Sequence, residues 1–156
     1  MQILLLAAGT RQPEWVNAGF NAYAIRLPHE CRLTLKEIPL SAKRRNNEAG
    51  KAVIDEGQRM LAAAPTGANL VALDVRGKSM NTENLAKQLQ GWLQAGRDLV
   101  LMIGGPDGLS EECLVRAGFC WSLSPLTLPH GMVRIIVAEQ LYRAWTVLAG
   151  HPYHRA

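Results

Sequence analysis

Short apolar runs of strand length alternate along this chain with longer segments of helical periodicity. The strand-like runs are residues 2–8, 31–38, 69–75, 98–103 and 119–123. A repeated succession of strand, helix and strand indicates parallel strands joined by helical crossovers. Nearly continuous apolar runs such as QILLLAA suit strands that are buried on both faces. The sequence therefore predicts an α/β fold, a three-layer sandwich with a mostly parallel sheet, and its 156 residues suit a single domain over 1–156.

Helical spacing of apolar residues predicts a helix in the intervening segments. The predicted helices span 13–27, 47–64, 82–95 and 130–149, with a shorter one after Ser110. Pro13 suits a first helical turn, Thr82 is a candidate N-cap, and Gly96 can end the helix that precedes it. The polar stretch SAKRRNNE, residues 41–48, is predicted to be an exposed loop.

The last predicted helix, 130–149, is apolar around almost its whole circumference. Such a helix must be covered on nearly every side, and one face of a sheet covers only one side. A second copy of the chain is a natural cover, so the sequence predicts a homodimer that packs through this helix. Glu139 and Arg143 lie four residues apart on its polar strip and can form an ion pair.

The charge balance is slightly basic, with 17 Lys and Arg against 13 Asp and Glu and a net charge of +4. This excess favours an anionic partner such as RNA only weakly, and a basic enzyme without such a partner fits it equally well. The three cysteines lack C-x-x-C spacing, which is typical of free thiols in a reducing compartment. No membrane span or secretory leader is evident, so we expect a soluble, cytoplasmic protein that does not bind a membrane.

Three polar or glycine-rich segments follow predicted strands: LDVRGKSMNTENL (73–85), LMIGGPDGLS (101–110) and WSLSPLTLPHG (121–131). In α/β sheets, ligands bind beyond the carboxyl ends of the strands, so these segments can form one pocket. Residues 101–110 match neither the phosphate-loop pattern nor G-x-G-x-x-G. The second segment can also be only a tight turn, and the third can be an ordinary linker.

The C-terminal residues combine rings and cations. His151 and His154 have H-x-x-H spacing, but no nearby Cys, Asp or Glu completes a metal site, so we expect no metal. Arg134, Arg143 and Arg155, with Tyr153, can supply phosphate and base contacts to RNA.

The chain closely resembles the RlmH family, a small bacterial group of SPOUT-class methyltransferases, in three segments. These are LDVRGKSMNTENLAKQL, LMIGGPDGLS and WSLSPLTLPHGMVRIIVAEQLYRAWTVLAGHPYHR. The early stretch LLLAAGTRQPEWVNAGFNAY matches as well, so the resemblance covers nearly the whole chain. It implies a homodimer and a C-terminal trefoil knot, which is rare among protein folds.

The resemblance also implies a cofactor, S-adenosylmethionine, bound in a bent pose by loops of the knot. Carried over position by position, the implied cofactor-binding residues are Leu73, Gly104, Leu123, Ser124, Pro125, Leu126, Thr127 and Leu128. These positions lie in the three segments that follow predicted strands.

The family's reaction, as the resemblance implies it, methylates N3 of a pseudouridine in a stem-loop of large-subunit (23S) ribosomal RNA on the assembled ribosome. We assign the catalytic work to the residues that follow Gly150, which we call the tail. His154 would accept the N3 proton, Tyr153 would stack on or hydrogen-bond the base, and Arg155 would hold a phosphate or carbonyl oxygen. His130 and Arg143 are further candidates, with Arg155, for RNA contact.

Two other functions fit parts of the sequence. A non-catalytic ribosome-associated factor would keep the fold and lose turnover. A different α/β enzyme would bind a nucleotide with the glycine-rich turn in residues 101–110, which we call the glycine turn, and would not depend on RNA. The intact glycine turn and the complete PYHR ending favour the methyltransferase.

Overall fold

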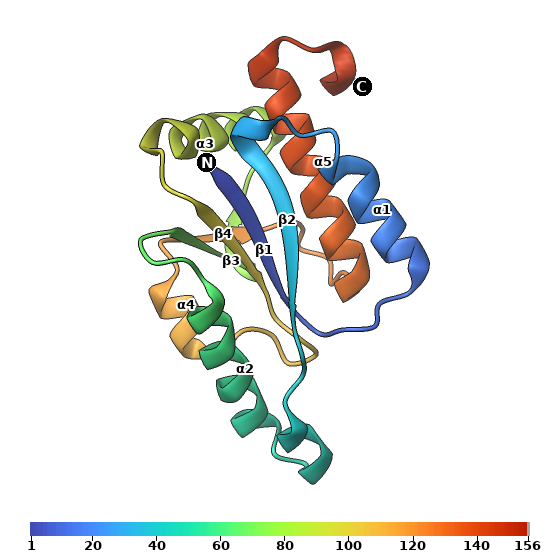
Figure 1. Ribbon diagram of the computed structural model, residues 1–156, viewed down its shortest axis with the longest axis vertical. Coiled ribbons are helices and arrows are strands. Elements are labelled where there is room, and N and C mark those ends of the chain that lie inside the picture. The colour runs from blue at the N-terminus through green and yellow to red at the C-terminus, as the bar shows by residue number, and fades with distance from the viewer. Residues whose placement is uncertain (156) are drawn as a thin grey trace.

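A parallel five-stranded sheet forms the centre of the computed structural model, which describes residues 1–155 (Figure 1). The strand order is β2-β1-β4-β3-β5, and every neighbouring pair is parallel. The strands are β1 (Gln2–Ala8), β2 (Arg32–Ile38), β3 (Asn69–Ser79), β4 (Leu99–Ile103) and β5 (Phe119–Ser122). The predicted α/β sandwich with a parallel sheet is therefore confirmed.

Helices cover both faces of this sheet (Figure 1). They are α1 (Glu14–Ala24), α2 (Ala49–Ala63), α3 (Thr82–Ala95), α4 (Glu111–Arg116) and α5 (His130–Ala149). Short 3-10 helices are η1 (His29–Cys31), η2 (Ala42–Asn46) and η3 (Pro152–His154). α1, α3 and α5 pack together on one face, and α2 packs with α4 on the other.

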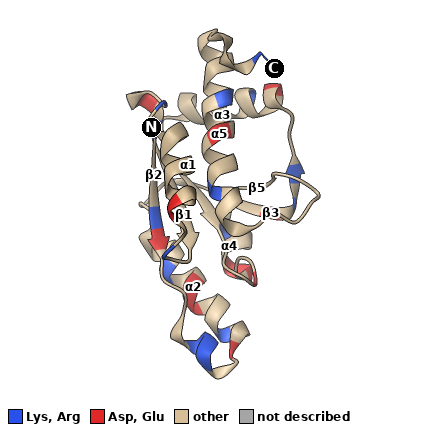
Figure 2. Ribbon diagram, turned by 90° about the vertical axis from the view of Figure 1, so that its right-hand side faces the viewer, with Lys and Arg blue, Asp and Glu red and all other residues tan. Residues whose placement is uncertain are grey.

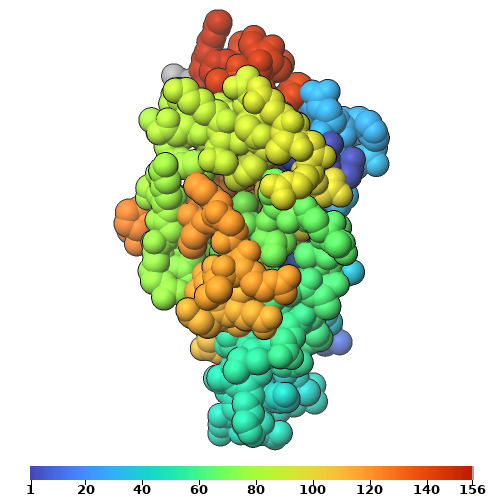
Figure 3. Space-filling model, turned by 90° about the vertical axis from the view of Figure 1, so that its left-hand side faces the viewer, coloured from blue at the N-terminus to red at the C-terminus, as the bar shows by residue number. Residues whose placement is uncertain are grey.

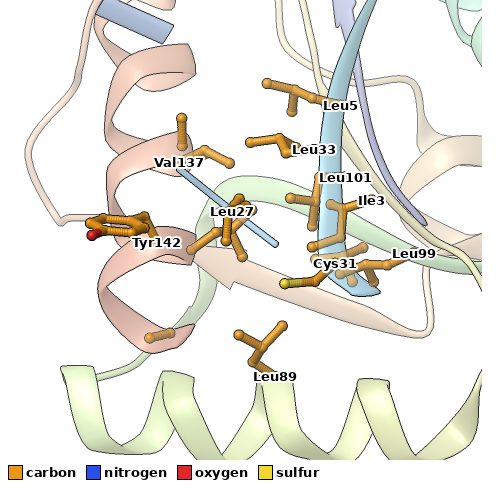
Figure 4. Close-up of a cluster of buried hydrophobic side chains, with 14 of the residues drawn as sticks. Ile3, Leu5, Leu27, Cys31, Leu33, Leu89, Leu99, Leu101, Val137 and Tyr142 are labelled. Carbon is orange, nitrogen blue, oxygen red and sulfur yellow. The ribbon is translucent and has the colours of Figure 1, made fainter. Parts of the chain in front are cut away.

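Alternate residues of each strand point into two separate cores. On β1, Ile3 and Leu5 face α1, α3 and α5, whereas Leu6 faces Met60 of α2. Figure 4 shows the larger core, in which strand side chains meet Leu89 of α3 and Val137 of α5. Burial on both faces is the reason why these strands are apolar throughout.

Most of the predicted boundaries agree with the structure, and three local expectations were wrong. Asn81 rather than Thr82 caps α3, because its side chain accepts a hydrogen bond from the Asn84 N–H at 2.8 Å. β3 does not end near residue 75 but continues to residue 79 after a bulge. Residues 41–48 are not simply an exposed loop, since η2 forms there and Arg44 is largely covered.

Helix α5 is covered mainly by its own chain. α1 runs beside it so closely that a Cβ at Gly19 would lie 2.7 Å from Ile135 Cδ1, and α3 packs on another side. The intrachain helices thus take much of the role that the sequence assigned to a second subunit. Trp15 of α1 and Met132 of α5 keep 56% and 38% of their surface exposed, so each of these helices still exposes a large apolar side chain.

The two ends of the sheet differ in what they carry. The chain ends above the amino ends of the strands, whereas η2 and the start of α2 form the tip beyond the carboxyl ends (Figure 1). Figure 3 views the side formed by α3, α4 and α2, with that tip at the bottom. Within residues 1–155, no helix is both long enough and apolar enough to cross a membrane.

Candidate functional site

A cavity of about 740 Å³ opens at the carboxyl ends of the parallel strands. The ends of β1, β3, β4 and β5 line it, together with the first turn of α5. This is the place at which parallel α/β sheets bind ligands. The volume falls in the range of about 300–1,000 Å³ that is typical of small-molecule sites.

The glycine turn after β4 forms one wall of the cavity. The Gly108 N–H donates to the Gly105 carbonyl at 3.0 Å and closes a tight turn, with Gly108 at a φ of +80°. A Cβ at Gly104 would lie 2.3 Å from the carbonyl carbon of Gly108 and 2.5 Å from the Leu109 nitrogen. Because both obstacles are backbone atoms, position 104 accepts only glycine in this geometry.

The irregular segment 123–128 forms the opposite wall. Ser124 holds its shape, because its Oγ accepts a hydrogen bond from the Leu126 N–H at 2.9 Å. Within residues 1–155, the N–H groups of Thr127 and Leu128 donate to no other protein group. Backbone donors are thus available to a ligand beside apolar side chains, which suits recognition of a heterocyclic base.

A bulge in β3 opens the floor of the cavity. Leu73 pairs with Trp121 of β5, and the chain then loops out before Lys78 pairs with the same tryptophan. The bulge carries Asp74, whose carboxylate accepts hydrogen bonds from the Arg76 N–H and guanidinium at 2.8–3.0 Å. The Arg76 guanidinium lowers the pKa of Asp74 below its usual value, so this carboxylate stays charged and paired.

The structure brings the sequence-predicted cofactor residues together around this one cavity. Its lining includes Leu73, Gly104, Leu123, Ser124, Leu126, Thr127 and Leu128. Pro125, which was also predicted, is exposed and does not line it. The three segments that follow predicted strands therefore converge on one site.

A buried hydrogen-bond network lies behind the cavity wall and was not expected from the sequence. Arg134 of α5 has no exposed surface, so the expectation that it contacts RNA was wrong. Its Nε donates to His130 Nε2 at 3.0 Å, and its two Nη atoms donate to Glu37 at 2.7 Å and to the Gly9 carbonyl at 3.0 Å. His130 Nδ1 in turn lies 3.1 Å from the Gly104 carbonyl. One arginine thus ties the ends of β1 and β2 to the glycine turn.

The network fixes the protonation state of His130. Nε2 must accept the bond from Arg134, so the ring is neutral with its proton on Nδ1, which donates to Gly104. Burial, followed by the positive Arg134, lowers the pKa of His130 below its ordinary value of 6.5. In this chain both ring nitrogens of His130 have protein partners, although the sequence suggested that this residue contacts RNA.

This shift predicts a pH dependence of stability. A histidine with a depressed pKa contributes stability fully above its unfolded value, near 6.5, and the contribution disappears as the pH falls through the folded value. We expect the free energy of unfolding to decline from about pH 7 to about pH 5 more steeply in the wild type than in His130→Gln. Urea unfolding across this range measures it, and parallel pH profiles for the two proteins would contradict the assignment.

The predicted catalytic residues lie elsewhere, at the far end of α5. The Tyr153 hydroxyl donates to Glu139 Oε1 at 3.1 Å, and Arg143 donates to the same oxygen at 2.6 Å, which confirms the expected Glu139–Arg143 pair. Burial, followed by the negative Glu139, raises the pKa of Tyr153 to about 12, so its hydroxyl stays protonated. His154 Nδ1 is buried and has no partner within residues 1–155.

The tail and the cavity of one chain are widely separated. The first turn of α5 lines the cavity, the tail follows its last turn, and a 20-residue helix is about 30 Å long (Figure 1). Tyr153, His154 and Arg155 therefore cannot reach the cavity of their own chain, and their catalytic roles stay predictions. Within residues 1–155, no cluster of three or more His, Cys, Asp or Glu side chains can hold a metal ion.

Comparison with known proteins extends over the whole chain. A family model described as "Predicted SPOUT methyltransferase" matches residues 1–154. A protein of Methylococcus capsulatus named "Ribosomal RNA large subunit methyltransferase H" is 55% identical over 155 residues, which cover 99% of this chain and 100% of that protein.

Solved structures share the fold at low sequence identity. A probable methylase family protein from Haemophilus influenzae aligns with a TM-score of 0.55 at 14% identity, covering 99% of this chain and 70% of the other. A ribosomal RNA small subunit methyltransferase E from Neisseria gonorrhoeae, bound to S-adenosyl methionine, aligns with a TM-score of 0.50 at 11% identity. That alignment covers 95% of this chain and 66% of the other.

Proposed function

This chain belongs to the SPOUT methyltransferase family, and from that premise we propose that it methylates N3 of a pseudouridine in large-subunit ribosomal RNA, using S-adenosylmethionine. The observation that carries the proposal is the convergence of the predicted cofactor residues on one cavity. The name of the relative at 55% identity supplies the RNA class. We take residues 1–156 as one domain, knotted in its C-terminal part as the family fold implies, and expect it in the cytoplasm with the ribosome.

The residues present fit the cofactor. The adenine would lie between the walls formed by the glycine turn and residues 123–128, where the Thr127 and Leu128 N–H groups are free to donate. Leu73 and Trp121 provide apolar surface at the floor. When bound, S-adenosylmethionine supplies an electrophilic methyl group on a sulfonium. The protein's part is to hold the acceptor nitrogen in line with that methyl and to remove its proton.

The tail supplies the groups for that task. An imide nitrogen between two carbonyls is mostly protonated at neutral pH, so a base must accept its proton. His154 has an unpartnered ring nitrogen, and Arg155 can hold a phosphate or a carbonyl oxygen. Tyr153 would stack its ring on the base, because its one hydroxyl proton is already donated to Glu139.

A homodimer would bring the tail of one chain to the cavity of the other. The tail of one chain lies about 30 Å from its own cavity, so it must serve the cavity of a second copy. The exposed apolar side chains of Trp15 on α1 and Met132 on α5 would contact that copy. In this arrangement each reaction site contains the cofactor loops of one subunit and the tail of the other.

His154→Ala is expected to reduce methyl transfer by at least about 100-fold, because a general base contributes roughly 10²–10⁴ to the rate. Cofactor affinity, measured by calorimetry, should stay within about twofold of the wild type, since His154 lies outside the cavity. Normal turnover of this variant at saturating ribosome and cofactor would remove the base assignment.

Methyl transfer from labelled S-adenosylmethionine tests the proposed function. Whole ribosomes, separated subunits and free RNA are offered, and the modified base is then mapped. We expect label on one pseudouridine of large-subunit RNA, with whole ribosomes as the best substrate. Cofactor binding without transfer to any of these would favour a non-catalytic ribosome-associated factor.

A further inference from the structure

Two arginines at the rim of the cavity have no role in the site described so far. Arg11 follows β1, and Arg45 belongs to η2, so both come from outside the three cofactor segments. Both are exposed, and neither side chain forms a hydrogen bond or an ion pair within residues 1–155. We call Arg11 and Arg45 the arginine pair.

The other titratable groups that line the cavity are already neutralised. Asp74 is paired with Arg76, and His130 is a neutral ring held by Arg134 and Gly104. The cavity therefore carries an uncompensated positive charge from the arginine pair. S-adenosylmethionine is itself a net cation, so this charge does not favour it. An anionic second substrate is needed for the charges to balance.

The backbone holds each arginine of the pair in a defined place. Arg11 has a φ of +56°, a left-handed conformation that non-glycine residues rarely adopt and that concentrates at functional sites. Arg45 is placed by its neighbour Arg44, which bonds Glu56 at 2.7–2.8 Å and Asp107 of the glycine turn at 2.6 Å. Glu56 is almost fully buried and also accepts from the Ser41 N–H at 2.7 Å, so η2 is anchored beside the cavity.

The tip beside the pair, formed by η2 and the start of α2 beyond the carboxyl ends of the strands, carries acidic as well as basic side chains (Figure 2). Arg44 is paired there with Glu56 and Asp107, so within residues 1–155 the unpaired cations that line the cavity are Arg11 and Arg45. A nucleotide that enters the cavity must bring its flanking phosphates past this rim. Guanidinium groups bind phosphate through two parallel hydrogen bonds.

From these observations we propose that Arg11 and Arg45 bind the RNA phosphates that flank the target nucleotide and so position it over the cofactor. This inference rests on the proposed function and adds RNA-positioning residues that the cofactor and tail assignments do not include. The pair acts on RNA affinity and leaves the cofactor contacts unchanged, because the latter lie on the glycine turn and residues 123–128.

The test compares Arg11→Gln/Arg45→Gln with a control of equal charge, Lys87→Gln/Arg116→Gln. The control residues are exposed on α3 and α4, outside the cavity lining, and Arg116 makes only an exposed ion pair with Glu112. Three quantities are measured for each protein: S-adenosylmethionine affinity by calorimetry, KM for ribosomes in methyl transfer, and the salt dependence of RNA binding.

We expect the variant of the pair to raise KM for ribosomes about 10–100-fold and to reduce the slope of log affinity against log salt by about 1.5. Its cofactor affinity should stay within about twofold of the wild type. Equal effects in the control, or a loss of cofactor affinity, would overturn the inference; the latter result would place the pair on the cofactor carboxylate. A wild type that methylates no RNA would instead contradict the proposed function, and RNA binding still tests the pair in that case.

Discussion

Gly104→Ala is expected to lower the affinity for S-adenosylmethionine by about 100-fold and the free energy of unfolding by about 1–3 kcal/mol. The added Cβ would lie 2.3–2.6 Å from backbone atoms of Gly108 and Leu109, and no flexible side chain can move to make room. The glycine turn must therefore open. Opening it moves the wall of the cavity and the carbonyl that His130 holds.

Gly91→Ala is the matched control for this substitution. Gly91 lies within α3, has nothing within 4 Å of the added Cβ, and is far from the cavity lining. We expect it to stabilise the protein by about 0.5–1 kcal/mol, because alanine restricts the unfolded chain and favours the helix. Calorimetry and urea unfolding measure both variants. Wild-type cofactor affinity in Gly104→Ala would show that the glycine turn does not bind the cofactor.

Arg134→Leu is expected to cost about 3 kcal/mol of unfolding free energy, with a further loss of cofactor affinity. Removing one partner of a buried ion pair leaves the other uncompensated, at a typical cost of about 3–5 kcal/mol. The lower end applies here, because the Glu37 side chain is one third exposed and water can solvate it. His130 also loses the donor to Nε2 and thus its fixed orientation against Gly104.

Arg143→Leu separates this effect from simple loss of a helical arginine. Arg143 lies on the same helix and pairs with Glu139, but a quarter of its side chain is exposed and its ion pair joins residues four apart. We expect it to cost about 1 kcal/mol or less. Urea unfolding of the two variants measures the contrast. If Arg134→Leu is as stable as Arg143→Leu, the network does not hold the cavity wall.

The sequence predicted the layers and the convergence of three segments on one pocket, because both depend on local patterns. Continuous apolar runs indicated strands buried on both faces, and each of the three segments follows a strand directly. The cofactor-binding residues within them are predictions that came from the family resemblance alone. The Arg134 network was not predicted, because its partners come from the ends of β1 and β2 and from the glycine turn, which only the tertiary fold brings together. One signal was available: a lone arginine on the apolar face of a helix, four residues after His130, needs buried partners.

The position of the tail was also beyond local reasoning. The residues after Gly150 resembled a catalytic ending, but only the length and direction of α5 show that they lie away from the cavity of their own chain. Similarly, SAKRRNNE had the composition of an exposed loop, whereas Glu56 and Asp107 draw Arg44 inward. In both cases distant segments decide the outcome.

A reaction site built from the cavity of one subunit and the tail of another can be detected by mixing two inactive variants. Gly104→Ala is expected to bind the cofactor weakly, and His154→Ala lacks the proposed base. Leu126→Arg replaces the first if it folds poorly, because Leu126 is 72% exposed on the cavity rim and a cation there repels the sulfonium.

After unfolding and refolding together in equal amounts, half of the dimers carry one chain of each kind. Each mixed dimer has one intact site if the tail crosses to the partner, so methyl transfer should return to about a quarter of the wild-type rate. Activity that stays at the level of the separate variants would rule out a shared site, because a tail serving its own cavity leaves no intact site in any mixture.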